Sequence, residues 1–384
     1  MRGLPPVHGH TDTRATLAAA ARAGSLPQSL LLHGPAGVGK ERLALWLAAL
    51  LLCEEPGGEG PCGACRACRR VDRLEHPDVH WFFPLPRPEG ASTPERLRDK
   101  LEEARGAELE ARRADPFHLP AYEKAPAYFL GTVQNLQRLA GMRPAMSRRK
   151  VFVVGDADAM VPQEASQEAA NAFLKLLEEP PPDTTLILTS SNPGALLPTI
   201  RSRVLPVRLL PLAAEEVAAF LEREKGMEPE AARALAATAR GAVGTALRLL
   251  PGGGGPGVLE RRRETGRALL VAATAESPAA RLAAAGAVAP AGARGEFTGG
   301  LEALALWLRD LMAVAAGAPE QVAYTRDLKL LQSIAGRRGV TPRGVAAALL
   351  KVQAAQELAF GNVNPQLILA ELLRGVRRDL LGTA

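Results

Sequence analysis

A glycine-rich loop near the N-terminus constrains the fold of this chain more than any other feature. The run Gly34-Pro35-Ala36-Gly37-Val38-Gly39-Lys40 follows a short apolar segment, residues 29–32, and precedes a helical pattern at residues 42–52. Glycines in such a loop let backbone N–H groups surround a phosphate, and Lys40 can reach the terminal phosphates. Strand, loop and helix in this order predict a parallel, helix-covered sheet with a nucleotide-type site at the loop.

The loop departs from its pattern at the residue that would hold magnesium. The pattern requires Ser or Thr after the lysine, because that hydroxyl coordinates Mg²⁺, and this chain has Glu41. Glu41 could ligate a metal, but it also places negative charge beside a polyphosphate. The residues that would bind nucleotide therefore form a degenerate set, which argues against binding of ATP with Mg²⁺ by this chain. The set consists of Gly34, Gly37, Gly39, Lys40 and Glu41.

A second departure follows the apolar run at residues 150–155, which predicts a buried strand. In hydrolysing proteins of this fold, an Asp that supports the magnesium and a Glu that orients the attacking water follow the strand. Here the two residues are Gly155 and Asp156. Glycine offers no ligand, and the shorter Asp would lie farther from any water. Alternatively, Asp156 and Asp158 cap the following turn.

All four cysteines of the chain lie within 16 residues, at Cys53, Cys62, Cys65 and Cys68. The spacing Cys-x₈-Cys-x₂-Cys-x₂-Cys suits a closed tetrahedral zinc site of structural rather than catalytic type. Four buried free thiols are the alternative, and the polar, glycine-rich surroundings disfavour it. The clustering also indicates a reduced, cytoplasmic protein, and the sequence contains neither a membrane span nor a signal peptide pattern.

The remaining pattern divides the chain into a mixed α/β part and an all-helical part. A helix stopped by Pro180 is predicted at residues 163–179, and a strand at 186–189. Residues 84–126 interrupt the α/β pattern, and a charged helix at 93–113 within them reads as solvated, with no assignable chemistry. Three short helices are expected at 213–250, a glycine-rich linker at 251–257 and a helical bundle at 259–381.

Two arginines follow the later strand in the run Thr199-Ile200-Arg201-Ser202-Arg203-Val204. At an exposed turn they could bind phosphate, form salt bridges or serve as surface charge, and the residues alone favour surface charge. The formal net charge of +6 permits contact with nucleic acid without demanding it.

Taken together, these motifs resemble the delta-prime subunits of bacterial replicative clamp loaders, a family of AAA+ proteins. The resemblance spans most of residues 1–250. It rests on the phosphate loop, the four-cysteine module and His76-Pro77-Asp78. It also rests on the block Asn171-Ala172-Phe173-Leu174-Lys175-Leu176-Leu177-Glu178-Glu179-Pro180-Pro181, which is highly specific to clamp-loader subunits, and on the run from Thr189 to Arg203.

The resemblance implies an α/β fold, with an AAA+ P-loop domain, a zinc module, a small helical lid and an all-α collar. The implied domains are residues 1–208 (with the zinc module at 53–68 and the insertion at 84–126), the lid at 209–250 and the collar or oligomerisation domain at 258–384. The hydrolysing gamma/tau members carry an arginine in the lid, where this chain has Gly244. With Glu41 and Gly155, this departure implies a subunit without intrinsic ATPase activity.

By the same resemblance, Ser202-Arg203 matches a Ser-Arg-Cys motif whose arginine enters the ATP site of a neighbouring subunit. Arg203 is thus expected to act in trans within an assembly of gamma/tau and delta subunits that loads the sliding clamp on primer–template DNA. Two alternatives remain open. One is an active gamma/tau-type ATPase, and the other is a zinc-dependent DNA-binding module that carries a relic nucleotide fold.

Overall fold

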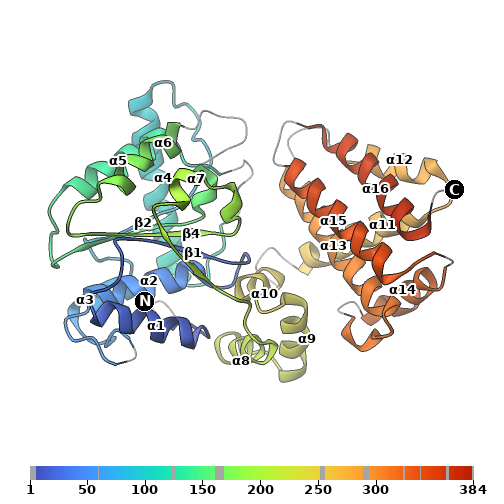
Figure 1. Cartoon of the computed structure of the whole chain (residues 1–384), viewed down its shortest axis with the longest axis horizontal. Helices are drawn as coiled ribbons and strands as arrows, with labels where there is room; N and C mark the ends of the chain where they lie inside the picture. The colour runs from blue at the N-terminus through green and yellow to red at the C-terminus, as the bar shows by residue number, and fades with distance from the viewer. Residues whose placement is uncertain are drawn as a thin grey trace. The chain divides into compact units, whose positions relative to one another are not determined.

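The computed structural model describes residues 6–58, 60–120, 122, 126–160, 168–250, 256–288, 294–322, 325–337, 339–359 and 363–382. The chain divides into two compact units, residues 1–248 and 249–384. The first unit contains a parallel sheet with helices on both faces, and the second is built from helices (Figure 1). This arrangement confirms the predicted fold class.

Five parallel strands form the sheet of the first unit, in the spatial order β2-β3-β4-β1-β5. The strands are β1 (Ser29–His33), β2 (Val79–Phe82), β3 (Lys150–Val154), β4 (Thr184–Ser190) and β5 (Leu205–Arg208). Strands β3 and β4 are buried along their whole length, because helices cover both faces of a parallel sheet. The strands predicted at 29–32, 150–155 and 186–189 are β1, β3 and β4.

Two strands of the sheet were not predicted. β5 is a short edge strand that contains Pro206 and is mostly exposed, and proline is tolerated at an edge because no ladder hydrogen bond is needed there. β2 lies at the opposite edge and has only four residues. Both therefore lack the long apolar run that marks the central strands.

Helices pack on the two faces of the sheet in two separate sets (Figure 1). One face carries α1 (Thr11–Arg22), α2 (Lys40–Leu52) and α3 (Arg66–Asp72), and the other carries α5 (Leu130–Gly141), α6 (Glu168–Glu178) and α7 (Pro198–Arg201). Alternate residues of β3 serve the two faces, since successive strand side chains point in opposite directions. Val151 and Val153 pack with Leu43 and Leu47 of α2, whereas Phe152 packs with Phe173 of α6.

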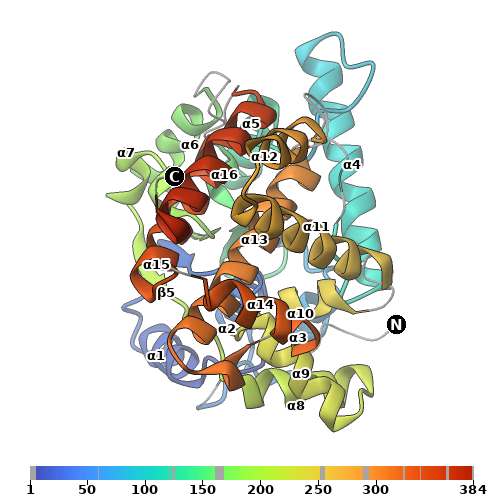
Figure 2. The same ribbon diagram turned by 90° about the vertical axis from the view of Figure 1, so that its right-hand side faces the viewer.

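The insertion contains one long helix, α4 (Pro94–Ala114), which Figure 2 shows in cyan. Thr93 caps it by accepting a hydrogen bond from the Arg96 amide at 3.3 Å, and Pro94 occupies the first position, where no donor is required. The helix predicted at 93–113 is thus confirmed. Its predicted character is wrong in part, because Leu101 and Arg112 are buried rather than solvated.

The His76-Pro77-Asp78 motif organises the loop that leads into β3. Asp78 is 1% exposed, and its carboxylate accepts the backbone amides of Ala145, Met146 and Ser147 at 2.5–2.8 Å. Three such bonds satisfy a buried carboxylate. The motif is therefore a structural element of the first unit.

Three helices follow β5, as expected for residues 213–250: α8 (Ala214–Lys225), α9 (Pro229–Ala239) and α10 (Val243–Leu249). Helix α6 was predicted over 163–179; residues 163–167 lie outside the described residues, and the helix ends at Glu178, before Pro180. Two short 3₁₀ turns, η1 (Ala157–Met160) and η2 (Pro193–Ala195), follow β3 and β4.

The second unit is a helical bundle (Figure 2), and buried apolar side chains of its described residues form its core. Its helices are α11 (Pro256–Thr274), α12 (Pro278–Gly286), α13 (Arg294–Ala315), α14 (Leu328–Ala335), α15 (Pro342–Ala359) and α16 (Pro365–Leu381), with the 3₁₀ turns η3 (Pro319–Gln321) and η4 (Thr325–Asp327). Helix α11 packs closely on α13: a Cβ on Gly266 would lie 2.7 Å from Trp307. Residues 251–255 of the predicted linker lie outside the described residues. The linker was predicted to extend to residue 257, but α11 already begins at Pro256.

Within the described residues, every helix is too short or too polar to cross a membrane.

Candidate functional site

The phosphate loop leads from the carboxyl end of β1 into α2, the position at which parallel α/β sheets bind ligands. The backbone at Gly37 has φ +80°, a left-handed conformation that glycine adopts without strain. Gly39 caps α2 with φ +99°. At these two positions the loop therefore adopts a backbone conformation that favours glycine.

Lys40 is folded back onto its own loop. Its ammonium donates to the carbonyl oxygens of Gly34 at 3.0 Å and Pro35 at 2.9 Å, and to the Ser191 hydroxyl at 2.9 Å. The side chain is 6% exposed, and this burial lowers the pKa of Lys40, while Asp156 and Glu41 raise it. An ammonium group has three hydrogens, so these bonds satisfy Lys40 without a phosphate.

Glu41 occupies the space beside Gly155. A Cβ placed on Gly155 would lie 1.9 Å from a Glu41 carboxylate oxygen, far inside van der Waals contact. The Gly155 backbone is fixed on both sides, since its amide donates to Phe82 at 2.8 Å and its carbonyl accepts from the Tyr128 hydroxyl at 2.6 Å. The two departures noted in the sequence are therefore one structural exchange, in which Glu41 fills the place of a side chain at 155.

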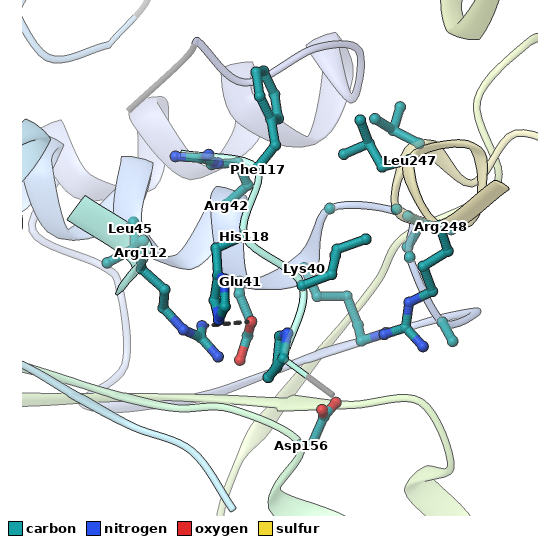
Figure 3. A pocket seen from close by; sticks show the side chains of 18 of the residues that line it. Lys40, Glu41, Arg42, Leu45, Arg112, Phe117, His118, Asp156, Leu247 and Arg248 are labelled. Carbon is teal, nitrogen blue, oxygen red and sulfur yellow. Dashed lines mark ion pairs between the residues drawn. The ribbon is translucent and has the colours of Figure 1, made fainter. Parts of the chain in front are cut away.

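An arginine from the insertion reaches the same place. Arg112, near the end of α4, forms an ion pair with Glu41 at 3.6 Å (Figure 3). It forms a second ion pair with Glu108 at 2.9 Å. Its guanidinium lies 4.2 Å from the ring centroids of both Trp81 and Phe83. Arg112 is 8% exposed, so aromatic faces and carboxylates replace its water shell.

The residues that follow α4 form a strap over the cleft, defined as residues 115–120. The Pro116 carbonyl accepts a hydrogen bond from Arg42 at 2.6 Å, and His118 lies 3.3 Å from a Glu108 oxygen. Phe117 meets the Phe220 ring of α8 edge-on, with centroids 5.6 Å apart. The strap thereby connects α2, the helix that follows the phosphate loop, to the lid helices.

The lid contacts the phosphate loop through backbone atoms. The amide of Gly244, in α10, donates to the carbonyl of Gly37 at 2.8 Å. A Cβ on Gly244 would lie 2.9 Å from the Cα of Gly37. The lid residue predicted to replace an arginine therefore lies directly against the loop.

Asp156 is the acidic group that faces the cleft from the end of β3 (Figure 3). Although it is open to the cleft, the surrounding protein removes part of its hydration, and with Glu41 and Asp158 this raises the pKa of Asp156 to about 6. Its backbone has φ +43°, and its amide donates to Thr189 at 2.9 Å. Among the described residues, the side chain of Asp156 makes no hydrogen bond that would cap the following turn.

A cavity of about 520 Å³ remains between the loop, the strap and the lid. It is open on one side and bounded by apolar side chains such as Leu45 and Leu247, with Asp156 and Arg248 at its polar end (Figure 3). Two of the cations at this site have partners in this chain: Arg112 pairs with Glu41, and Lys40 donates to carbonyl and hydroxyl oxygens.

The four cysteines converge on one point. Their sulfur atoms all lie within 4.8 Å of one another, and the pairs Cys53–Cys65 and Cys62–Cys68 are both 4.0 Å apart. Tetrahedral zinc with Zn–S bonds of 2.3 Å requires sulfur atoms roughly 3.8 Å apart. Backbone amides donate to three of the sulfurs at 3.3–3.4 Å, which stabilises thiolates. The cluster can hold a metal ion.

Arg203 lies apart from these groups, on the turn after α7. Its guanidinium pairs with Glu178 at 2.8 Å and donates to the carbonyl of Thr199 at 3.0 Å. Both ion-pair partners are substantially exposed. Val204, which stands where the motif has Cys, is buried. Arg203 therefore extends from a fixed turn while its own head group stays near solvent.

Sequence reasoning missed the residues that the insertion brings to the cleft, namely Glu108, Arg112, Phe117 and His118. The charged pattern of residues 93–113 predicted the helix but not its neighbours. One signal was present: Trp81 in β2 and Phe83 just after it need a covering group, and a long arginine side chain can supply it.

Comparisons with known proteins agree with the motifs. A family model described as "DNA polymerase III, delta subunit" matches residues 9–213, more than half of the chain. DNA polymerase III subunit delta' of Pseudomonas aeruginosa is 37% identical over 236 residues, covering 61% of this chain and 58% of that protein. The Bacillus subtilis delta' subunit is 30% identical over 211 residues, covering 55% and 50%.

A second type of relative is more distant. Escherichia coli DNA polymerase III subunit tau is 29% identical over 248 residues, covering 63% of this chain and 32% of that protein. The chain spans about half the length of the delta' relatives it matches. A solved structure of a gamma subunit-related protein from Thermotoga maritima is 16% identical, with a TM-score of 0.33 over 94% of this chain and 98% of that one.

Proposed function

This chain belongs to the delta-prime family of DNA polymerase III clamp-loader subunits, and from that premise we propose that it is a subunit that does not hydrolyse ATP. In this role it completes the ATP site of a neighbouring gamma/tau subunit. The assembly, with gamma/tau and delta subunits, loads the sliding clamp on primer–template DNA.

The exchange between Glu41 and Gly155 carries the first part of this proposal. Hydrolysis in this fold needs Mg²⁺ held by the loop hydroxyl and the strand Asp. Here the carboxylate of Glu41 fills the space where that Asp would extend, and Lys40 is satisfied by its own loop. The groups that would bind Mg²⁺ and the terminal phosphate are thus absent or engaged.

The placement of Arg203 supports the second part. Its surface ion pair with Glu178 contributes about 0–1 kcal/mol to stability, so the fold depends little on this arginine. A guanidinium on a rigid turn can exchange one carboxylate for a phosphate of a neighbouring subunit. An arginine supplied in trans accelerates hydrolysis by roughly 10³–10⁵ in the best-studied cases.

We further propose that the four-cysteine cluster holds structural zinc and that the helical bundle of the second unit serves as the collar. All four sulfurs face one point, so no coordination position is left open for a substrate. The bundle has a complete core of its own, as a domain that assembles with neighbouring subunits requires. The domains are then residues 1–208, 209–250 and 258–384.

The test compares Arg203→Ala with Arg201→Ala in the complex reconstituted with gamma/tau and delta subunits. Arg201 is a matched control, because it is exposed two residues earlier, at the end of α7. Arg203→Ala should lower clamp- and DNA-stimulated hydrolysis by up to the share of one site, and clamp loading should fall further. Arg203→Lys should be nearly as harmful, since an ammonium lacks the planar fork.

The isolated chain should show no ATPase activity above background, and Arg201→Ala should behave as wild type throughout. Normal assembly and clamp loading at the wild-type rate by the Arg203→Ala complex would refute the role in trans. Magnesium-dependent turnover by the isolated chain would instead identify an active gamma/tau-type ATPase.

A further inference from the structure

The insertion at residues 84–126 has no part in the function proposed above, yet two of its segments enter the nucleotide cleft. The end of α4 brings Arg112 to Glu41, and the strap lies across α2 and α8. These contacts join segments that are about 70 and 100 residues apart in sequence. Arg112 is buried, and Pro116 and Phe117 of the strap are partly buried, so this part of the insertion is not a fully solvated surface.

We propose that the insertion is an internal ligand of the cleft. In this assignment the Arg112 guanidinium takes the place of the divalent cation, and the strap holds the lid helices to the loop in place of a nucleotide. The inference concerns this chain alone and does not depend on its role in a clamp loader.

Charge balance is the first argument. Glu41, Glu108 and Asp156 bring three carboxylates to one side of the loop, where the like charges of Glu41 and Asp156 repel. Lys40 is buried nearby, but its hydrogens are bound to carbonyl and hydroxyl oxygens. Arg112 is the cation that pairs with both glutamates. A magnesium ion would meet the same electrostatic need in a nucleotide-binding relative of this fold.

Packing is the second argument. The head group of Arg112 lies against Trp81 and Phe83, whose ring centroids are both 4.2 Å from the guanidinium carbon. Removing a buried charge from such a site leaves its partners uncompensated, which costs more than an exposed pair contributes. The position is thus built for a planar cation.

The strap supplies the third argument, because it contacts both sides of the cleft. Arg42 of α2 donates to the Pro116 carbonyl, and Phe117 packs edge-on against Phe220 of α8. Lys225, also in α8, lies 4.0 Å from the Phe117 ring centroid. A bound nucleotide commonly joins loop and lid in such domains; here a segment of the chain makes that connection.

Thermal unfolding of the full chain tests the assignment of Arg112. Four proteins are compared: wild type, Glu41→Gln, Arg112→Met and the double variant. Methionine keeps an apolar stem against the two rings, so the comparison isolates the charge. We expect Arg112→Met to lower Tm by roughly 2–6 °C beside Glu41. The loss should be smaller beside Gln, because one of the two carboxylates left without a partner, Glu41 but not Glu108, is then gone. An equal loss in both backgrounds would overturn the proposal.

A second measurement asks whether a metal can replace the guanidinium. Millimolar MgCl₂ without nucleotide should raise the Tm of Arg112→Met and leave that of the wild type unchanged. Arg113→Met is the matched control, since the neighbouring guanidinium donates to the Leu74 carbonyl at 2.6 Å and not to Glu41 or Glu108. No response of Arg112→Met, or an equal response of the control, would contradict the assignment.

Should Arg112→Met fail to fold, Arg112→Lys supplies the same two comparisons. Its ammonium is compact and cannot span two carboxylates as a planar fork does. The proposal then expects a smaller loss of Tm than for methionine and a partial response to MgCl₂. A lysine variant that matches the wild type in both measurements would overturn it.

Discussion

A single residue pair, Glu41 and Gly155, explains why this phosphate loop differs from a hydrolysing one. While Glu41 is present, a side chain at 155 would overlap its carboxylate. Glu41 and Gly155 are compatible, because the longer side chain fills the space that glycine leaves. The two positions should therefore be treated as one coupled unit in any mutational study.

Gly155→Asp tests this coupling. In the wild-type background we expect it to lower the free energy of unfolding by about 1–3 kcal/mol, from overpacking and repulsion with Glu41. In a Glu41→Thr background the loss should be much smaller, since the space is then free. Urea unfolding measures both. Equal losses in the two backgrounds would show that the residues do not share one space.

Asp156 gives a prediction about pH. Its pKa of about 6 in the folded chain lies above the ordinary value near 4, so the folded state binds the proton more tightly than the unfolded state. The unfavourable effect of ionising Asp156 is fully present above pH ~6 and disappears as pH falls toward ~4. Asp156→Asn, which tolerates positive φ, should raise Tm near neutral pH.

The difference in Tm between Asp156→Asn and wild type should close as the pH is lowered below about 4, because the aspartic acid is then neutral in both states. Thermal scans across this range measure it. A difference that stays constant with pH would mean that the substitution acts through hydrogen bonding or packing instead.

At the scale of single elements, the sequence predicted what depends on local pattern. The central strands, the phosphate loop and the helix α4 follow from apolar runs, glycine spacing and periodicity. The edge strand β5 was missed because it is short, exposed and contains Pro206. The position of Arg112 was missed for a different reason: its partner Glu41 is distant in sequence, and pairing at such a distance leaves no periodic signal.

The four-cysteine module is the element whose prediction is most directly measurable. Protein purified without chelator should contain one zinc per chain by metal analysis. Cys62→Ser should lose the metal and expose residues 53–72 to proteolysis, because α3 carries Cys68 and packs on α2 through Ala67 and Val71. The sheet should remain intact, with little change in the main unfolding transition.

Ala64→Ser is the control for this variant, because Ala64 is exposed within the same module and offers no sulfur to the site. It should retain zinc and resist proteolysis as the wild type does. Absence of zinc in the wild-type protein would rule out the metal and leave four free thiols.

At the scale of the whole molecule, the chain has two units. Sequence motifs predicted the fold of the first unit, whereas only the helical composition of the second unit predicted its structure. Residues 9–213, which match the family, lie in the first unit. The second unit has a core formed by residues such as Leu304, Trp307 and Leu373, but no motif. Its helices were predictable from Ala- and Leu-rich periodicity, whereas their pairing required the structure, since many helix arrangements satisfy one pattern.

The contact between Gly37 and Gly244 bears on how this protein can change over evolutionary time. An arginine at 244 would need room where the backbones of the loop and α10 already touch, since even its Cβ would lie 2.9 Å from Gly37. Regaining a catalytic lid by that single substitution would first damage the fold. Gly155 adds a weaker constraint, because a Cβ there would meet the flexible end of the Glu41 side chain rather than backbone. If this subunit does not hydrolyse ATP, as we propose, restoring the missing groups would take several changes together, including a movement of α10 away from the loop.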